Sequence, residues 1–300
     1  MKTLLLFSLL FLSEFAFTQN ASLLLETAYK EKSGKKLTDF FDIWQKETSV
    51  VSENELSKQN DTLKQAYKVF TAFYNPSEIG KLGGSEWGND IYKAVSYLIA
   101  QDKIKIYFKD KIFYTEQEID DYVVTEIKRA IKNDSTRQHF LERKDDKLSK
   151  IVLENFSPMN GFSDDIDERL VDSIKDFRPN LTCKNKVVLY LTPKYDTILN
   201  AFLGNTFLPL GSGSIMTPAR ATIESEKRKI FLEKKIKIWY GHWGGYWQLL
   251  SYPQVYSIAF DREMKYAKVN FRMVYEGGEA ILKNSNTKWI ILSAKRTWIE

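Results

Sequence analysis

The sequence predicts an α+β protein, with a largely helical N-terminal part and a curved antiparallel sheet in its C-terminal part. Three observations support this class. Apolar residues recur at helical spacing between residues 21 and 74, whereas apolar and polar residues alternate between Ala267 and Tyr275. Two turn-forming pairs, Gly277-Gly278 and Ser285-Asn286, follow the alternating segment. A period of about 3.6 residues is typical of helices and a period of two is typical of strands.

The composition is that of a globular chain with enough apolar residues for a core. Of the 300 residues, 43% are hydrophobic and 28% are charged, which is close to the average of soluble domains. The net charge of +5 results from 44 basic and 39 acidic residues that are interspersed along the chain. Because the basic residues do not cluster, we expect no nucleic-acid partner.

Residues 1–18 have the pattern of a secretory signal peptide. Lys2 precedes an apolar run from Leu4 to Leu12, and a more polar stretch then leads to Thr18. The run is shorter than the roughly 20 residues that a membrane-spanning helix needs. We therefore expect a secreted or periplasmic protein without a membrane span; a buried N-terminal helix is the alternative. Cys183 is the only cysteine, so the chain cannot form an internal disulfide.

Residues 19–178 are expected to form a mainly helical domain. Two apolar stripes at helical spacing indicate helices, namely Leu37, Phe40, Phe41 and Trp44, and then Leu56, Leu63, Tyr67, Phe70 and Tyr74. The segment from Ala94 to Phe108 is interpreted as a small hairpin with a break at Gln101-Asp102. A further amphipathic helix that ends before Pro179 is predicted from Ile166, Leu170, Ile174 and Phe177.

Residues 179–300 are expected to form an α+β domain. Its first strand is predicted between Lys186 and Thr192, and a helix follows from Pro193 to Gly204. Thr217-Pro218 is a favourable helix start, because Thr can cap the helix and Pro suits its first position. This helix is predicted to extend to about Glu233, before the meander begins.

The meander starts with the alternating segment, whose apolar face consists of Ala267, Val269, Phe271, Met273 and Tyr275. A two-residue turn is predicted at Gly277-Gly278, and this turn would pair Met273 with Leu282. A second turn at Ser285-Asn286 would place Trp289 beside Leu282. Both turns then continue one apolar face, which predicts three or four antiparallel strands.

This arrangement resembles the NTF2-like superfamily of cone-shaped α+β domains. The resemblance depends on a helix that leads into the meander, on the alternation of Ala267, Val269 and Phe271, and on Trp289-Ile290-Ile291 in the last strand. It covers at most residues 217–300, and the strand at 186–192 is an addition to the family pattern. It implies a curved sheet that wraps round a helix and encloses a pocket, which members use as an active site, for binding or for dimerisation. Fold alone does not determine function.

The densest group of aromatic residues lies between Trp239 and Trp247 and is the main candidate for ligand binding. Exposed aromatic rings stack on sugars and other planar ligands. The alternative is that these rings pack against one end of the sheet. The expected ligand-binding residues are Trp239, Tyr240, Trp243, Tyr246 and Trp247, together with Arg272 and Arg296.

His242 lies within the aromatic group and is a candidate catalytic base. A general base needs a carboxylate that orients it and a pocket that admits substrate; a structural role for the histidine is the alternative. The chain has two histidines and one cysteine, and they do not form a metal-binding spacing. We therefore expect neither a metal nor a cofactor.

Glu276 and Glu279 are the other catalytic candidates. Across the predicted turn they would face each other, on the side opposite Phe271, where Arg272 and Arg296 could supply counter-charges. Two close carboxylates perturb each other's pKa, which suits proton transfer. The alternative is that both glutamates lie in water, where screening weakens their repulsion.

From these features we expect a secreted or periplasmic, non-catalytic module that binds a small molecule, glycan or protein through an aromatic-lined pocket or patch. The alternative is a hydrolase-type enzyme that uses His242 with Glu276 or Glu279. The sequence contains no nucleophile elbow, phosphate loop or dinucleotide fingerprint. The two hypotheses differ in whether His242 and a glutamate meet in one concave pocket.

Overall fold

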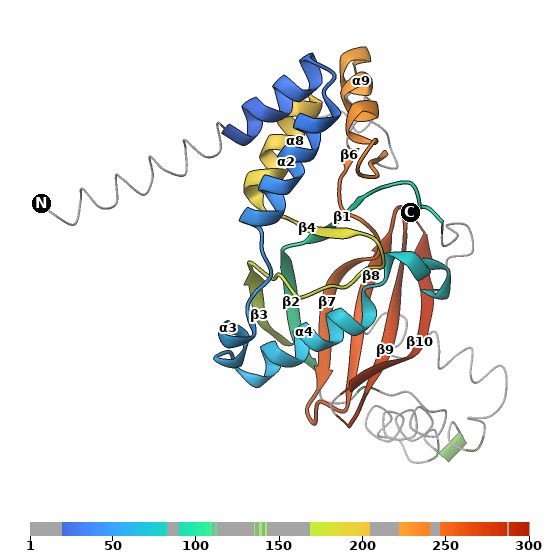
Figure 1. Cartoon of the computed structure of the whole chain (residues 1–300). Helices are drawn as coiled ribbons and strands as arrows, with labels where there is room; N and C mark the ends of the chain where they lie inside the picture. Colours follow the sequence, from blue (N-terminus) through green and yellow to red (C-terminus); the bar gives the residue numbers. More distant parts are fainter. Residues whose placement is uncertain are drawn as a thin grey trace, which may run out of the picture.

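The chain has an α+β fold in which several helices lie at one end of a six-stranded sheet and another helix covers one of its faces (Figure 1). The computed structural model describes residues 20–82, 90–109, 112, 135, 138–139, 142, 169–204, 222–240, 247–286 and 288–299. Besides a helical segment at residues 20–30, the helices are α2 (Gly34–Glu47), α3 (Glu53–Ser57), α4 (Asp61–Phe73), the 3-10 helix η1 (Pro76–Leu82), α8 (Pro193–Leu203) and α9 (Ile223–Leu232). The strands are β1 (Tyr97–Gln101), β2 (Lys103–Lys109), β3 (Arg169–Lys175), β4 (Val187–Leu191), β5 (Trp239–Tyr240), β6 (Trp247–Gln248), β7 (Gln254–Asp261), β8 (Tyr266–Met273), β9 (Glu276–Ser285) and β10 (Lys288–Ile299).

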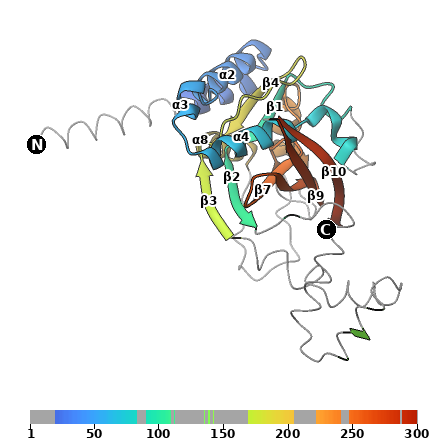
Figure 2. The same cartoon turned by 90° about the horizontal axis from the view of Figure 1, so that it is seen from below.

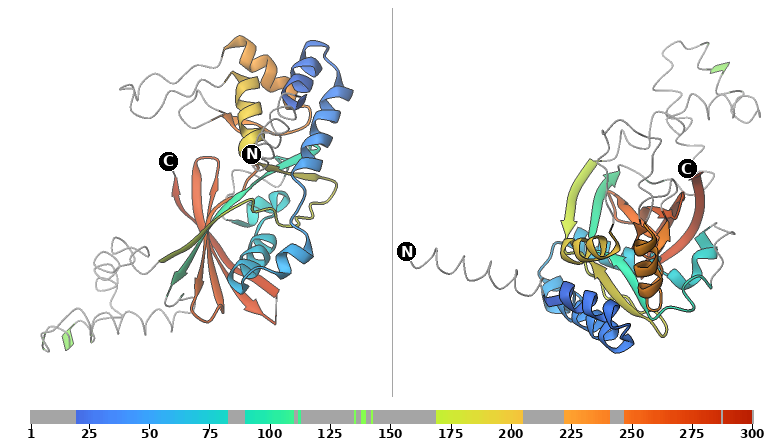
Figure 3. Two further views of the ribbon diagram at one scale, coloured as in Figure 1. Left: turned by 90° about the vertical axis from the view of Figure 1, so that its left-hand side faces the viewer. Right: turned by 90° about the horizontal axis from the view of Figure 1, so that it is seen from above.

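The large sheet has the strand order β10-β9-β8-β7-β2-β3. Its strands β7 to β10 form the antiparallel meander that the alternating segment predicts. Strand β2 joins β7 in parallel and β3 antiparallel, so the sheet is mixed. Figure 2 shows β3 and β10 at opposite edges, and the left view of Figure 3 shows the strong twist of the strands. Residues from both sides of the boundary expected after residue 178 contribute strands to this one sheet.

The predicted register of the meander is wrong, although its apolar face is correct. Met273 pairs with Glu276, so the turn between β8 and β9 lies at Val274 and Tyr275 rather than at the two glycines. Leu282 consequently pairs with Ala267 instead of Met273. In the next hairpin, Leu282 pairs with Ile291 instead of Trp289. Both slips are an even number of residues, so the residues from Glu279 onward keep their predicted face, whereas Glu276, next to the displaced turn, changes face.

The two glycines lie inside β9, where the absence of a side chain lets aromatic rings pack against the strand. A Cβ atom at Gly277 would lie 1.9 Å from the Trp298 ring, and one at Gly278 would lie 2.7 Å from the Phe271 ring. These contacts are shorter than any that real side chains make, so only glycine allows a ring to cover β9 at these positions. Val274 adopts the turn instead, with a φ of 52°. A positive φ is rare for a β-branched residue, which explains why the sequence favoured the glycines.

Helix α4 covers one face of the sheet. Its buried side chains pack against that face and form with it the larger of two hydrophobic cores. The helix begins after Asn60, whose side chain accepts a hydrogen bond from Leu63 N at 2.8 Å, as expected of a helix cap. Phe73 packs against Phe271 with 5.3 Å between ring centroids. Gln65 Oε1 accepts a hydrogen bond from Trp289 Nε1 at 2.9 Å and ties the helix to β10.

A short parallel pair, β1 with β4, separates this core from a second, helical core. Successive residues of β1 alternate between the cores: Tyr97 and Ile99 face the helices, and Leu98 and Ala100 face the large sheet. Leu189 and Tyr190 divide in the same way on β4. This double burial follows from the period of two in a strand. The pair β1–β4 is therefore a wall that both cores share.

Two local predictions in the N-terminal part are wrong. Residues 94–108 do not form a hairpin, because β1 pairs with β4 whereas β2 pairs with β3 and β7. The predicted helix ending at Phe177 is instead the edge strand β3, in which Ile174 pairs with Ile104. The four-residue interval between Leu170 and Ile174 fits one face of a helix, but a register shift in β3 pairs Leu170 with Tyr107 and leaves it exposed.

In the C-terminal part, the predicted strand and helix after residue 185 are confirmed as β4 and α8. Helix α8 ends at Gly204, whose φ of 66° is the left-handed conformation typical of a glycine cap. The predicted helix start at Thr217-Pro218 lies outside the described residues. The described helix α9 is capped by Thr222, which accepts a hydrogen bond from Ser225 N at 3.0 Å.

Candidate functional site

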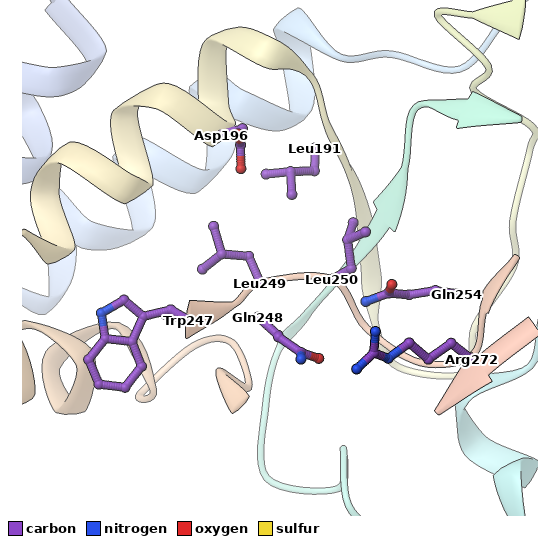
Figure 4. Close-up of a pocket in the computed structure, with 8 residues that line it drawn as sticks. All are labelled: Leu191, Asp196, Trp247, Gln248, Leu249, Leu250, Gln254 and Arg272. Atoms are coloured by element: carbon purple, nitrogen blue, oxygen red, sulfur yellow. The ribbon is translucent and has the colours of Figure 1, made fainter. Parts of the chain in front are cut away.

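A cavity of about 250 Å³ lies where the helical end of the molecule meets the large sheet (Figure 4). Five segments contribute to it: the end of β4, the first turn of α8, β6 with the loop that follows, the start of β7 and the end of β8. Its polar lining residues are Asp196, Gln248, Gln254 and Arg272. Its apolar lining residues are Leu191, Trp247, Leu249 and Leu250.

Gln254 and Arg272 are adjacent because they are register partners on β7 and β8. Opposed residues of an antiparallel pair share one face of the sheet, here the face opposite α4. The row continues across the sheet, since Arg272 is opposite Gly277 and Gly277 is opposite Trp298. The Trp298 ring lies over Gly277, and its centroid is 5.9 Å from the Arg272 guanidinium carbon. Gly277 thus leaves space for a ring that supports the arginine.

The Arg272 guanidinium is also held by the turn that follows it. Its Nε donates a hydrogen bond to the Val274 carbonyl at 2.5 Å, and its Nη1 lies 3.5 Å from the Tyr256 hydroxyl. Val274, whose φ is 52°, supplies this carbonyl from the turn between β8 and β9. Arg272 is half-buried. The sheet therefore presents a positioned cation to the cavity, with the amide of Gln254 beside it (Figure 4).

The loop between β6 and β7 is fixed against β1 by hydrogen bonds, so its side chains have defined places in the cavity wall. Ser251 N donates to the Ile99 carbonyl at 2.7 Å, and Ile99 N donates to Ser251 Oγ at 2.9 Å. The Gln101 amide spans the Val255 backbone: its Oε1 accepts from Val255 N at 2.7 Å and its Nε2 donates to Val255 O at 2.6 Å. These hydrogen bonds anchor the loop at Ser251 and at Val255. They thereby fix the neighbouring lining residues, Leu250 before Ser251 and Gln254 before Val255.

Asp196 lies on the other side of the cavity, in the first turn of α8. The helix starts there because Pro193 occupies its first turn, where a missing N–H costs nothing. The Asp196 carboxylate accepts a hydrogen bond from Asn200 Nδ2 at 3.0 Å and is exposed. The cavity consequently has a carboxylate on the α8 side and a guanidinium on the sheet side, with Leu249 and Leu250 between them (Figure 4).

The structure describes three residues of the predicted aromatic group, and they mainly pack. Trp247 is buried in the helical core, 4.8 Å from the Tyr240 ring between centroids. Trp239 is half-buried and meets Tyr252 edge-on at 5.9 Å. Trp247 is nevertheless one of the residues that line the cavity. His242, Trp243 and Tyr246 lie outside the described residues.

Tyr240 is exposed and contacts helix α9. Its hydroxyl donates to the Glu226 carboxylate at 2.7 Å, and the Lys229 ammonium lies 4.9 Å from its ring centroid. Desolvation together with the hydrogen bond to Glu226 raises the pKa of Tyr240 to about 12. The hydroxyl therefore remains protonated at neutral pH and ties β5 to α9.

The expected facing of Glu276 and Glu279 is wrong, because the turn lies at Val274 and Tyr275. Glu276 pairs with Met273 on the face that α4 covers, and it is completely buried. Glu279 pairs with Asn270 on the opposite face. The shift of the turn thus places the two carboxylates on opposite faces of the sheet. Neither glutamate is among the residues that line the cavity.

Each glutamate has a basic partner on β10. Arg296 Nη1 donates to Glu276 Oε1 at 2.6 Å, which agrees with the arginine support expected for that carboxylate. Lys295 Nζ lies 2.8 Å from Glu279 Oε1. Arg296 accordingly lies on the α4 side of the sheet, away from Arg272. Of the two arginines predicted to bind ligand, only Arg272 lines the cavity.

The described part of the chain contains no group of three or more His, Cys, Asp or Glu side chains arranged to hold a metal ion. Within the same residues, every helix is too short or too polar to cross a membrane. Comparisons of the chain with protein-family models, curated proteins and solved structures gave no match.

Sequence reasoning found Trp247 and Arg272 but missed the rest of the cavity lining. Gln248 and Gln254 flank a loop, where no periodic pattern marks a side chain as functional. Asp196 belongs to the helix predicted from Pro193 to Gly204, and nothing in the helical pattern marks this side chain as functional. The one usable signal was the pairing of a polar residue at the start of β7 with Arg272, and this pairing depends on the hairpin between β7 and β8.

Proposed function

We propose that the chain is a non-catalytic module that binds a small molecule in the cavity between α8 and the six-stranded sheet. The observation that supports this proposal is the positioned guanidinium of Arg272, which shares an apolar-walled cavity with two glutamine amides. Small-molecule sites typically combine apolar walls with a few convergent polar groups. A binding site on rigid strands also needs little reordering when the ligand arrives.

The cavity volume limits the size of the ligand. Sites for drug-sized molecules usually enclose about 300–1,000 Å³, whereas this cavity encloses about 250 Å³. A metabolite-sized molecule fits that volume, but a folded protein or a long glycan does not. We therefore favour a small molecule over the other two ligand classes that the sequence left open.

The rival hypothesis, a hydrolase, has less support from the geometry. Its two candidate glutamates lie on opposite faces of the sheet, and each forms an ion pair. Among the described lining residues, Asp196 is the only carboxylate, and its partner is Asn200 rather than a nucleophile. General acid–base catalysis needs groups that reach the same reacting atom.

A ligand screen by thermal shift, run on the wild type and two arginine variants, tests the proposal. Arg272→Gln removes the cavity cation, whereas Arg262→Gln removes an exposed cation from the turn at the other end of the same hairpin. A ligand present at 100 times its Kd stabilises the folded protein by about 2.7 kcal/mol. We expect compounds that raise the Tm of the wild type and of Arg262→Gln by several degrees, and a much smaller rise for Arg272→Gln.

Arg272→Gln also loses contacts within the protein, so Gln254→Leu serves as a second cavity variant. This substitution changes the lining but leaves the Arg272 contacts to Val274 and Trp298 in place. Ligand-induced shifts that are identical in the wild type, Arg272→Gln and Gln254→Leu would place binding elsewhere and contradict the proposal.

A further inference from the structure

We infer that the ligand of this cavity is a small zwitterion, whose anionic group meets Arg272 and whose cationic group meets Asp196. This inference rests on the proposed function and adds the chemical class of the ligand. It starts from the distribution of charge in Figure 4, where the guanidinium and the carboxylate lie on different sides of one cavity. A ligand that spans the cavity meets both charges.

The sheet side suits a carboxylate or a similar planar anion. A guanidinium offers N–H donors in a planar fork that matches the two oxygens of a carboxylate. Gln248 and Gln254 lie beside Arg272 in Figure 4, and each amide group has two further N–H donors. Because Arg272 is half-buried and held by Val274 and Trp298, its charge is less screened than that of a mobile surface arginine.

The α8 side suits an ammonium group. Asp196 is an acceptor-only group when ionised, and its hydrogen bond from Asn200 occupies one of several acceptor positions. Because Asp196 is exposed, its attraction for a cation is screened by water. The geometry therefore assigns most of the charge-dependent affinity to Arg272 and a smaller share to Asp196.

The wall between the two charges is aliphatic. Leu249 is buried and Leu250 is half-buried, and both lie between Asp196 and Arg272 in Figure 4. Aliphatic side chains pack well against a methylene chain and offer no hydrogen bonds to polar groups. A short chain of methylenes that separates a carboxylate from an ammonium fits this order of polar, apolar and polar surface.

Titration calorimetry with a matched ligand series tests the inference. The series comprises ω-amino acids from glycine to 6-aminohexanoate, with hexanoate, hexylamine and neutral hexanamide as controls for each charge. We expect one of the longer ω-amino acids to bind best, then hexanoate, with hexylamine and hexanamide weaker. Arg272→Gln should weaken binding of the best ligand about 10–100-fold, as expected for a charged hydrogen bond, and Asp196→Asn about 2–5-fold, as expected for an exposed ion pair.

Asp61→Asn is the matched control for Asp196→Asn, because Asp61 is also an exposed aspartate in the first turn of a helix. It should leave every affinity unchanged. Asp196→Asn should in addition abolish the preference for the ω-amino acid over hexanoate, an effect that loss of stability alone does not produce. Equal affinities of the wild type for 6-aminohexanoate, hexanoate and hexanamide would overturn the inference, and so would failure of the whole series to bind. If neutral compounds bind and Arg272→Gln weakens that binding, the assignment of a zwitterionic ligand is wrong but the proposed binding function stands.

Discussion

Replacing Phe271 with aspartate is expected to unfold the six-stranded sheet and the helix that covers it. Phe271 is 1% exposed, packs against Phe73 and lies over Gly278. The substitution removes a large buried ring, which costs about 3–5 kcal/mol, and it buries an unpaired carboxylate, which costs several kcal/mol more. The sum is comparable with the 5–15 kcal/mol that stabilises a typical folded protein. Urea denaturation followed by circular dichroism measures the loss.

Lys283→Asp is the control for this prediction. Lys283 is exposed on the opposite face of the sheet, so the change should alter stability by about 0.5 kcal/mol or less. Lys268 is not a suitable control: its polar position in the alternating segment predicts an exposed side chain, but it is 6% exposed and therefore buried. Equal denaturation midpoints for Phe271→Asp and Lys283→Asp would show that the face assignment of the meander is wrong.

Replacing Trp44 with alanine is expected to cause the second largest loss, this time in the helical core. Trp44 is fully buried and stacks on Tyr195, with ring centroids 4.6 Å apart and an interplanar angle of 6°. Its Nε1 donates to the Tyr190 carbonyl at 2.9 Å and so ties α2 to β4. We expect a loss of about 3–5 kcal/mol, which corresponds to a fall in Tm of about 6–20 °C by calorimetry.

Trp44→Phe separates packing from hydrogen bonding at the same position. It keeps a ring against Tyr195 but leaves the Tyr190 carbonyl without its donor, which costs about 1–3 kcal/mol. The alanine variant should therefore melt below the phenylalanine variant. If both variants melt at the temperature of the wild type, the stacked ring does not contribute to the helical core as the structure indicates.

The elements of the fold could largely be predicted from the sequence, whereas their pairing could not. Alternation at residues 267–275 predicted β8 and its buried face, and the helical stripe that includes Trp44 predicted α2. The position of the turn between β8 and β9 could not be predicted. Glycines favour turns because they adopt a positive φ, but Gly277 and Gly278 instead leave space for the rings of Trp298 and Phe271. The parallel pairs of β1 with β4 and of β2 with β7 join distant segments, which local patterns do not reveal.

The candidate site shows the same division. Arg272 was identified because it could supply a counter-charge to Glu276 and Glu279, and Trp247 because it belongs to an aromatic group. Asp196 and Gln254 acquire a role only through tertiary structure, when α8 and the start of β7 meet beside β8. The expected pair Glu276 and Glu279 failed for a local reason, since one displaced turn moved them to opposite faces of the sheet.

The central claim, that the cavity beside Arg272 binds a small molecule, is tested most directly by methyl NMR on leucine- and isoleucine-labelled protein. Leu191, Leu249 and Leu250 line the cavity, whereas Ile290 and Ile299 are exposed on β10 and serve as internal references. Titration with the ω-amino acid series should shift the methyl signals of the three leucines, to an extent that saturates, and leave those of the two isoleucines unchanged. Leucine signals that stay fixed for every compound in the series and in the thermal-shift screen would contradict the claim.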